Sequence, residues 1–166
     1  MTRMIHFSLP DDPALLAAVG KVAIRHGQLD FVLRRTIKSI ENLTIAQGDD
    51  ATAGQGSAEL RRRVRKLARR KLGEGRALLL LEALLTRAGR ATRRRNELLH
   101  GLWVAELDAK AMVLRDDGSS AEVPRVPELE GLVDELTAIA NELNDARLVG
   151  FLKEALDAAD GTARTS

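Results

Sequence analysis

The sequence predicts a mainly α-helical fold, an antiparallel four-helix, up-and-down bundle with a small β-hairpin or meander inserted before the last helix. Two observations lead to this prediction. Apolar residues recur at alternating steps of three and four over most of the chain, as on a helix with one buried face. The 166 residues include one Trp, three Phe and no Tyr, so the core is expected to be aliphatic, which favours helices. At this length we expect residues 1–166 to form a single domain.

The first helix is expected to span about residues 12–45. Asp12 is a favourable N-cap, and Pro13 suits the first helical position. A helix of this length is on the order of 50 Å long, so it is expected either to bend near Gly27 or to project into a partner. Gly20 and Gly27 lie one heptad apart on one face. We therefore expect another helix to pack closely against this face.

Two further helices are expected after a loop at residues 46–57, which has a Gly- and Asp-rich loop composition. One spans about residues 57–72, with Ser57 as its N-cap, and the next spans about residues 76–100. Gly101 follows directly and is a typical helix stop.

The periodicity changes after the third helix. Short extended runs around the turn residues Asp117 and Gly118 predict a β insert at about residues 102–123. Pro127 then opens the last helix, which is expected over about residues 127–158. Four amphipathic helices with this insert favour a helical bundle.

The composition excludes several classes of function. The absence of cysteine excludes disulfides and thiolate metal sites and fits a cytoplasmic protein. No apolar run approaches the length of a membrane span, so no membrane association is expected. The spacing of His and acidic residues suits no zinc site, and no phosphate loop, dinucleotide fingerprint or Gly-x-Ser-x-Gly elbow is found. We therefore expect neither a metal nor a cofactor.

Charge is unevenly distributed along the chain, although the net charge is only +2. Residues 56–100 carry fourteen basic and four acidic side chains, whereas residues 101–166 carry six and fourteen. Such a basic surface attracts a polyanion through its phosphates, so RNA is the expected partner. Alternatively, the acidic C-terminal part lies against these arginines, within the chain or across a dimer. The expected RNA-binding residues are Arg61, Arg62, Arg65, Arg69, Arg90, Arg93 and Arg94.

A polar motif lies late in the third predicted helix, where Arg95 and Asn96 are followed by His100. Arg95 falls on the apolar seam, and Asn96 and His100 are about one helical turn apart. A guanidinium, an amide and an imidazole together suggest a phosphate site. Taken singly, Arg95 could instead form a structural ion pair with Asp30 or Glu97, and His100 could serve only as a partner of the helix dipole.

His26 and Asp30 are secondary candidates for the same site. They are four residues apart and so share one face of the first helix. A single histidine on an apolar seam is more often a core residue whose hydrogen bonds are satisfied, and this alternative stays open here.

The spacing Arg-Asn-x-x-x-His, late in a long third helix, resembles the signature of the HEPN superfamily, named for higher-eukaryote and prokaryote nucleotide-binding domains. The first-helix segment from His26 to Phe31 is similar to the place where many HEPN proteins carry an apolar-acidic pair. The resemblance covers about residues 12–100 and 127–158, so the β insert looks lineage-specific. It implies metal-independent RNA cleavage by a homodimer, with the three motif residues as the catalytic groups and the two motifs meeting across the two-fold axis.

Two functions follow from this resemblance. The first is an endoribonuclease, such as a toxin or defence enzyme with a neutralising partner protein, in which an imidazole moves protons and a guanidinium holds the phosphate. The second is a non-catalytic HEPN-like module that binds RNA, a nucleotide or a protein. The presence of both Arg95 and His100 favours the first. A third reading, a purely structural dimer with paired acidic and basic helices, predicts weak, salt-insensitive behaviour towards nucleic acid.

Overall fold

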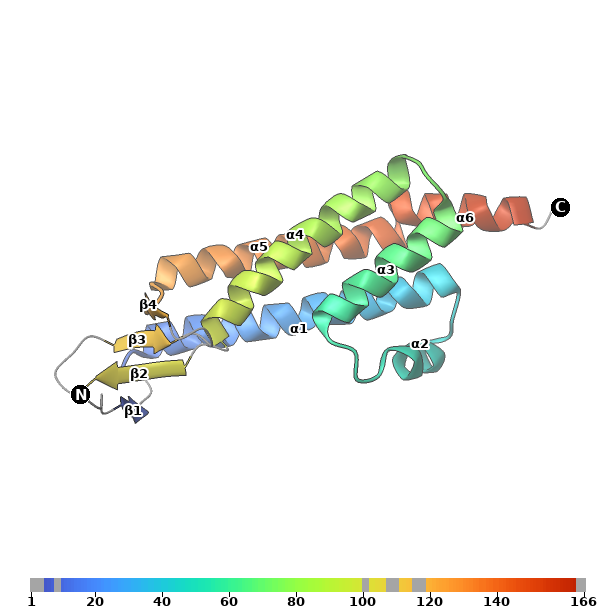
Figure 1. Cartoon of the computed structure of the whole chain (residues 1–166). Coiled ribbons are helices and arrows are strands. Elements are labelled where there is room, and N and C mark those ends of the chain that lie inside the picture. Colours follow the sequence, from blue (N-terminus) through green and yellow to red (C-terminus); the bar gives the residue numbers. More distant parts are fainter. Residues whose placement is uncertain (1–4, 8–9, 100–101, 107–110, 115–118, 164–166) are drawn as a thin grey trace.

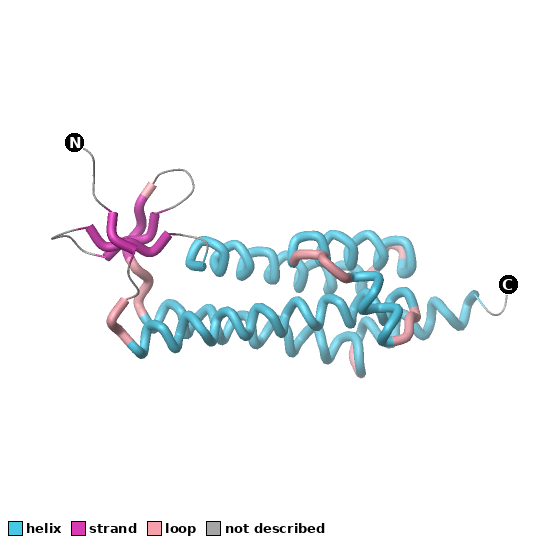
Figure 2. Tube along the Cα trace, turned by 90° about the horizontal axis from the view of Figure 1, so that it is seen from below, coloured by secondary structure: helices cyan, strands magenta, loops and turns pink. Residues whose placement is uncertain are grey.

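The computed structural model describes residues 5–7, 10–99, 102–106, 111–114 and 119–163. Its helices form an elongated bundle, and a small sheet lies at one end of this bundle (Figures 1 and 2). The helices are α1 (Pro13–Glu41), α2 (Ile45–Thr52), α3 (Ser57–Leu72), α4 (Arg76–Leu99), α5 (Val126–Leu148) and α6 (Phe151–Ala163). The strands are β1 (Ile5–Phe7), β2 (Leu102–Glu106), β3 (Ala111–Leu114) and β4 (Ser120–Glu122). The predicted mainly helical fold is confirmed.

The core of the bundle is aliphatic, as the scarcity of aromatic residues predicts. All of the largest fully buried side chains are Leu or Ile, and they come from α1, α3, α4, α5 and α6. Full burial of each such side chain contributes about 1.5–3 kcal/mol. The apolar seams of the helices therefore meet in one core, and the most extensive contact is between α1 and α5.

Helix α1 begins as predicted, because the Asp12 side chain accepts a hydrogen bond from the amide of Leu15 (3.0 Å) and Pro13 opens the helix. It ends at Glu41 rather than near residue 45. Asn42 adopts the left-handed conformation (φ 52°) that commonly follows a helix end.

The segment predicted as a loop at residues 46–57 instead contains the short helix α2. Its start is a capping box, in which Thr44 Oγ1 accepts from the amide of Gln47 and Gln47 Oε1 accepts from the amide of Thr44. The composition of the segment predicts a loop. The helix forms because this reciprocal pair of hydrogen bonds stabilises its start, and composition alone does not reveal such a pair.

Helix α2 reverses the chain, so that α1 and α3 run in the same sense (Figure 1). Contacts along the two helices follow the same direction. His26 of α1 meets Ser57 at the start of α3, and Glu41 at the end of α1 meets Arg63 one and a half turns further along α3. The prediction of a strictly antiparallel, up-and-down bundle is therefore wrong for these two helices.

Helix α4 runs antiparallel to its neighbours α3 and α5, whereas α1 and α5 run in the same sense, which also departs from the predicted up-and-down bundle (Figure 1). Between α3 and α4, Arg61 meets Thr92 and Arg69 meets Glu82. Helix α5 runs back along α4 in the opposite direction (Figure 1). As a result, the start of α3 lies beside the end of α4 and the middle of α1.

The single helix predicted at residues 127–158 is two helices, α5 and α6, which are separated at Val149 and Gly150. Both of these amides donate to the carbonyl oxygen of Asp145, at 3.0 and 2.9 Å. A Cβ atom at Gly150 would lie 3.2 Å from the Cα atom of Ala146. The periodicity continues across the break, which is why the sequence predicts an uninterrupted helix.

The predicted β insert is present as three strands, and an unpredicted fourth strand joins it. The sheet is an antiparallel meander in the order β1-β2-β3-β4. Strand β1, from the N-terminal segment, pairs with β2 in a register that places His6 opposite Ala105. The sheet lies at the end of the bundle where α4 ends and α5 begins (Figure 1).

The α1 face that carries Gly20 and Gly27 packs against no helix among the described residues. A Cβ atom at either position would meet nothing within 4 Å. Ile24 and Phe31 on the same face are 65% and 52% exposed. The prediction of close helix packing against this face is thus not met within the described part of the chain.

Candidate functional site

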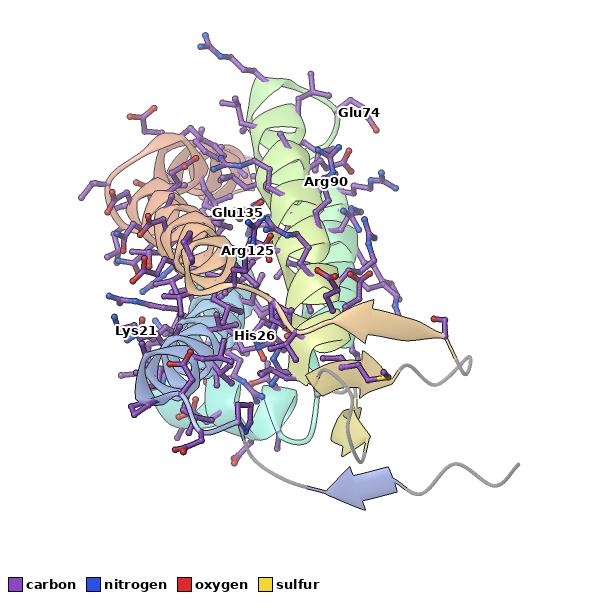
Figure 3. All side chains as sticks on the ribbon, turned by 90° about the vertical axis from the view of Figure 1, so that its left-hand side faces the viewer. Lys21, His26, Glu74, Arg90, Arg125 and Glu135 are labelled. Carbon is purple, nitrogen blue, oxygen red and sulfur yellow. The ribbon has the colours of Figure 1, made fainter. Side chains whose placement is uncertain are left out.

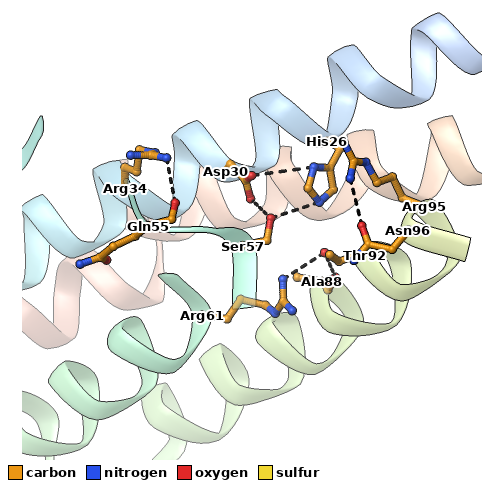
Figure 4. A network of polar contacts seen from close by, with 10 residues as sticks. All are labelled: His26, Asp30, Arg34, Gln55, Ser57, Arg61, Ala88, Thr92, Arg95 and Asn96. Atoms are coloured by element: carbon orange, nitrogen blue, oxygen red, sulfur yellow. Dashed lines mark hydrogen bonds and ion pairs between the residues drawn. The ribbon is translucent and has the colours of Figure 1, made fainter. Parts of the chain in front are cut away.

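Three helices bring polar side chains together near the middle of α1, in an arrangement that we call the polar cluster (Figure 4). Helix α1 contributes a histidine and an aspartate, the start of α3 contributes a serine and an arginine, and the last turns of α4 contribute a threonine, an arginine and an asparagine. The members of the polar cluster are His26, Asp30, Ser57, Arg61, Thr92, Arg95 and Asn96.

His26, Asp30 and Ser57 form the inner part of the cluster. Ser57 Oγ donates a hydrogen bond to Asp30 Oδ1 and lies 3.2 Å from His26 Nε2. His26 Nδ1 lies 3.8 Å from Asp30 Oδ2. Because the serine proton goes to Asp30, the serine oxygen is available to accept the Nε2 proton of a neutral His26. The expectation that His26 and Asp30 share one helix face is confirmed, and both side chains contact the same serine.

Burial holds the pKa of His26 below its usual value of 6.5, since the residue is only 6% exposed. Asp30 acts in the opposite direction and raises this pKa, whereas the charges of Arg95 and Arg61 lower it. The net effect favours the neutral imidazole.

Ser57 enters the cluster because it does not cap its helix. The N-cap of α3 is Gly56, which has no side chain to form a capping hydrogen bond, and Ser57 is the first helical residue. The prediction of Ser57 as the N-cap is therefore wrong. Its hydroxyl points towards α1 instead (Figure 4), and sequence reasoning missed this role because a serine at a helix start is usually explained by capping.

Arg61 lies one turn further along α3, and its guanidinium is held against α4. Its Nη1 donates to Thr92 Oγ1 (3.0 Å), and Thr92, which is 5% exposed, donates in turn to the carbonyl oxygen of Ala88 (2.8 Å). Burial lowers the pKa of Arg61, Asp30 raises it, and the charges of Arg65 and Arg93 lower it further. The site therefore contains a partly buried guanidinium whose hydrogen bond goes to a neutral hydroxyl group.

The motif at the end of α4 lies at the edge of this cluster. Arg95 is half-buried and donates from Nη1 to the exposed Asn96 Oδ1 (3.0 Å). Its guanidinium lies beside the ring of His26 (Figure 4), in agreement with its effect on the His26 pKa. His100, the last residue of the motif, lies outside the described residues. The structure thus brings four of the five predicted site residues together, namely His26, Asp30, Arg95 and Asn96.

The basic residues of α3 and α4 fall into two groups. One group forms ion pairs, as the alternative reading of the charge pattern predicts in part. Arg87 pairs with Glu142 and Arg94 with Glu135, both on α5. Within the ranges that the structure describes, the other group forms no ion pair within 4 Å, and it includes Arg61, Arg62, Arg65, Lys66, Arg70, Arg76, Arg90 and Arg93.

Of the seven predicted RNA-binding residues, Arg69 and Arg94 belong to the ion-paired group, since Arg69 pairs with Glu82. Figure 3 shows this division around α4, with Glu135 on the side that faces α5 and Arg90 on the side away from it. Within α3 and α4, the positive charge that is not compensated by carboxylates therefore lies on α3 and on the side of α4 away from α5.

No group of three or more His, Asp or Glu side chains within the described ranges is arranged to hold a metal ion. None of the helices in the described ranges has the length and apolar character needed to cross a membrane.

Comparison with known proteins gives no match for this chain among protein-family models, curated proteins or solved structures.

Proposed function

We propose that this chain is a metal-independent endoribonuclease of the HEPN type that acts as a homodimer. The observation that carries the proposal is the polar cluster, in which a buried imidazole lies beside the guanidinium of the Arg-Asn-x-x-x-His motif. The HEPN-like character of the bundle is part of this proposal. It rests on the resemblance of the motif and on its place at the end of a long helix.

The proposed reaction uses the ribose 2′-hydroxyl as the nucleophile. An imidazole accepts the hydroxyl proton as the 2′-oxygen attacks phosphorus, the bond from phosphorus to the 5′-oxygen breaks, and the leaving oxygen takes up a proton. The products are a 2′,3′-cyclic phosphate and a 5′-hydroxyl. His100 is the proposed proton-transfer group, and Arg95 stabilises the charge that develops on the phosphate. In a homodimer each motif supplies one imidazole, so one can act as base and the other as acid.

His26, Asp30 and Ser57 are proposed to position the motif rather than to react. His26 is largely buried and already contacts Ser57 and Asp30. The charge of Asp30 lies close enough to Arg61 and His26 to oppose the lowering of both pKa values that burial causes. These contacts fix the relative positions of the helix faces that carry Arg95 and Arg61.

A second candidate function is supported by the same satisfied contacts. If His26 is a core residue, the cluster can serve a non-catalytic module that binds RNA, a nucleotide or a protein through the basic residues of α3 and α4. This module would hold RNA without cutting it.

Cleavage of an end-labelled RNA pool in EDTA separates the two functions. We expect the wild type to cut RNA to 2′,3′-cyclic phosphate ends, and Arg95→Ala and His100→Ala each to lower the rate by about 100-fold or more. Lys153→Ala, in the exposed ion pair with Asp157 on α6, is the control and is expected to cut at the wild-type rate. All variants are first shown to be folded by circular dichroism.

If the wild type binds RNA but does not cut it, and both motif variants bind equally well, the endoribonuclease proposal fails. The binding-module function then accounts for the basic surface.

A further inference from the structure

We infer that the α3–α4 basic face, defined by Arg61, Arg62, Arg65, Lys66, Arg90 and Arg93, is a track for one strand of single-stranded RNA, with Arg61 as its innermost phosphate ligand. This inference rests on the proposed function and adds the strandedness of the substrate and the path that it takes. It concerns binding, so it can be tested separately from cleavage.

The first argument is the distribution of counter-charges. Several basic side chains elsewhere on the bundle, though not all of them, have carboxylate partners, as in the pairs Arg63–Glu41 and Arg87–Glu142. The six residues of the α3–α4 basic face form no ion pair within 4 Å in the described ranges. The α3–α4 basic face therefore stays positive, although the sequence has fourteen acidic side chains after residue 100.

The second argument is the position of Arg61. A half-buried guanidinium loses hydration, and this loss is costly unless an anion compensates for it. Burial, which is the largest cause, and two further positive charges, Arg65 and Arg93, lower the pKa of Arg61, whereas Asp30 raises it. Thr92 holds one of its nitrogen atoms in place, and Arg61 Nε lies 3.6 Å from where a Cβ atom at Gly89 would be, so the guanidinium passes along α4. A phosphate group would add negative charge beside these three arginines.

The third argument is that one end of the α3–α4 basic face adjoins the polar cluster. Arg61 is one turn from Ser57, so the inner end of the track reaches the polar cluster and Arg95 (Figure 4). His26 in that cluster is 6% exposed, so it is buried between the helices. A flexible single strand can follow the helix surface as far as this cluster. A duplex holds its phosphates on the outside of a stiff helix and is recognised by its overall shape.

The chemistry of the face also predicts weak base preference. The two aromatic side chains that the structure describes, Phe31 and Phe151, are on α1 and α6. Without a stacking platform on α3 or α4, binding depends on phosphate contacts, which carry no sequence information.

The test measures binding of a fluorescent 12-nucleotide RNA with 2′-O-methyl riboses, which cannot be cut by 2′-hydroxyl attack. Two triple variants are compared with the wild type between 50 and 300 mM NaCl. The track variant is Arg61→Gln, Arg65→Gln and Arg93→Gln. The control variant removes the same number of charges from ion-paired positions and is Arg63→Gln, Lys71→Gln and Arg87→Gln.

We expect the track variant to bind about 100-fold more weakly at 0.1 M salt and to lower the slope of log affinity against log salt by about 2, which corresponds to about 0.7 for each lost single-strand contact. The control variant is expected to keep the wild-type slope. A hairpin duplex of the same length is expected to bind the wild type more weakly than the single strand does. If the triple track variant does not fold, the exposed Arg93→Gln alone is expected to lower the slope by about 0.7.

Equal weakening by the two triple variants would overturn the track, because net charge alone would then explain binding. Equal binding of hairpin and single strand, or no RNA binding by the wild type, would overturn it as well. Loss of RNA binding in the track variant but not in the control variant supports the track, even if the protein never cuts RNA. In that case only the endoribonuclease proposal fails. If the track is wrong but Arg95→Ala still abolishes cleavage, only this inference fails.

Discussion

His26 shows how a single buried titratable group links the polar cluster to stability. Its neutral form is favoured in the folded protein because burial lowers its pKa; the charge of Asp30 opposes this lowering, and the charges of Arg95 and Arg61 add to it. In the unfolded chain its pKa returns to about 6.5. Between the lowered folded value and 6.5, the unfolded state binds more protons, so stability rises with pH.

We therefore expect the free energy of unfolding to decrease as the pH falls from 7.5 to 5.5, with a contribution from His26 of at most about 1.4 kcal/mol per pH unit. His26→Gln removes this proton while keeping a group that can contact Ser57, and its unfolding free energy should change less over the same range. Urea titrations of both proteins at several pH values measure the difference. Identical pH dependence in the two proteins would show that His26 is not held neutral by its surroundings.

At the level of helices, the break between α5 and α6 depends on Gly150. The amides of Val149 and Gly150 share the carbonyl oxygen of Asp145. A Cβ atom at Gly150 would lie closer to the backbone of Ala146 than ordinary packing allows, at 3.2 Å from its Cα atom. A side chain at this position would therefore require the backbone of the preceding turn to shift by a few tenths of an ångström.

We expect Gly150→Ala to destabilise the protein by about 1–3 kcal/mol, as overpacking usually does. The matched control is Gly131→Ala in α5, where a Cβ atom would meet nothing within 4 Å. There the helix propensity of alanine should stabilise by up to about 1 kcal/mol. Thermal and urea unfolding of the three proteins measures both effects. A stabilising Gly150→Ala would mean that α5 and α6 can join into one helix at little cost.

At the scale of the whole molecule, the direction of the helices decides which side chains meet. Helix α2 returns the chain so that α3 starts beside the middle of α1, and the antiparallel α4 then ends at the same place. Ser57 and Arg95 reach His26 for this reason. Because α4 and α5 are also neighbours, Arg87 and Arg94 are neutralised by carboxylates of α5, and the remaining positive charge is left towards α3.

The proposed composite site requires two copies of the chain. We expect size-exclusion chromatography with light scattering to give twice the mass of one chain at micromolar concentration. The exposed Ile24 and Phe31, and the open space at Gly20 and Gly27, leave one face of α1 without a partner in the described part of the chain. A strict monomer that still cuts RNA would contradict the composite site, and each chain would then have to supply both proton-transfer groups.

The sequence by itself determined the helical class, the aliphatic core and the start of most helices. These features depend on short-range patterns, namely a period of about 3.6 residues, the Asp12-Pro13 cap and the glycine after α3. The sequence also pointed to His26 and Asp30 on one helix and to Arg95 and Asn96 on another, because the two residues of each pair are close together along their helix.

Only the tertiary structure decided how these pieces meet. The capping box of α2 and the break at Gly150 depend on particular atoms rather than on composition, so neither was predicted. Ser57 and Thr92 join the cluster through contacts across 31 residues of sequence, and a helical pattern specifies a buried face without specifying its neighbour. The same reason explains why the sequence could not separate Arg61 and Arg93 from Arg87 and Arg94: an arginine is neutralised only by the carboxylate that the fold places next to it.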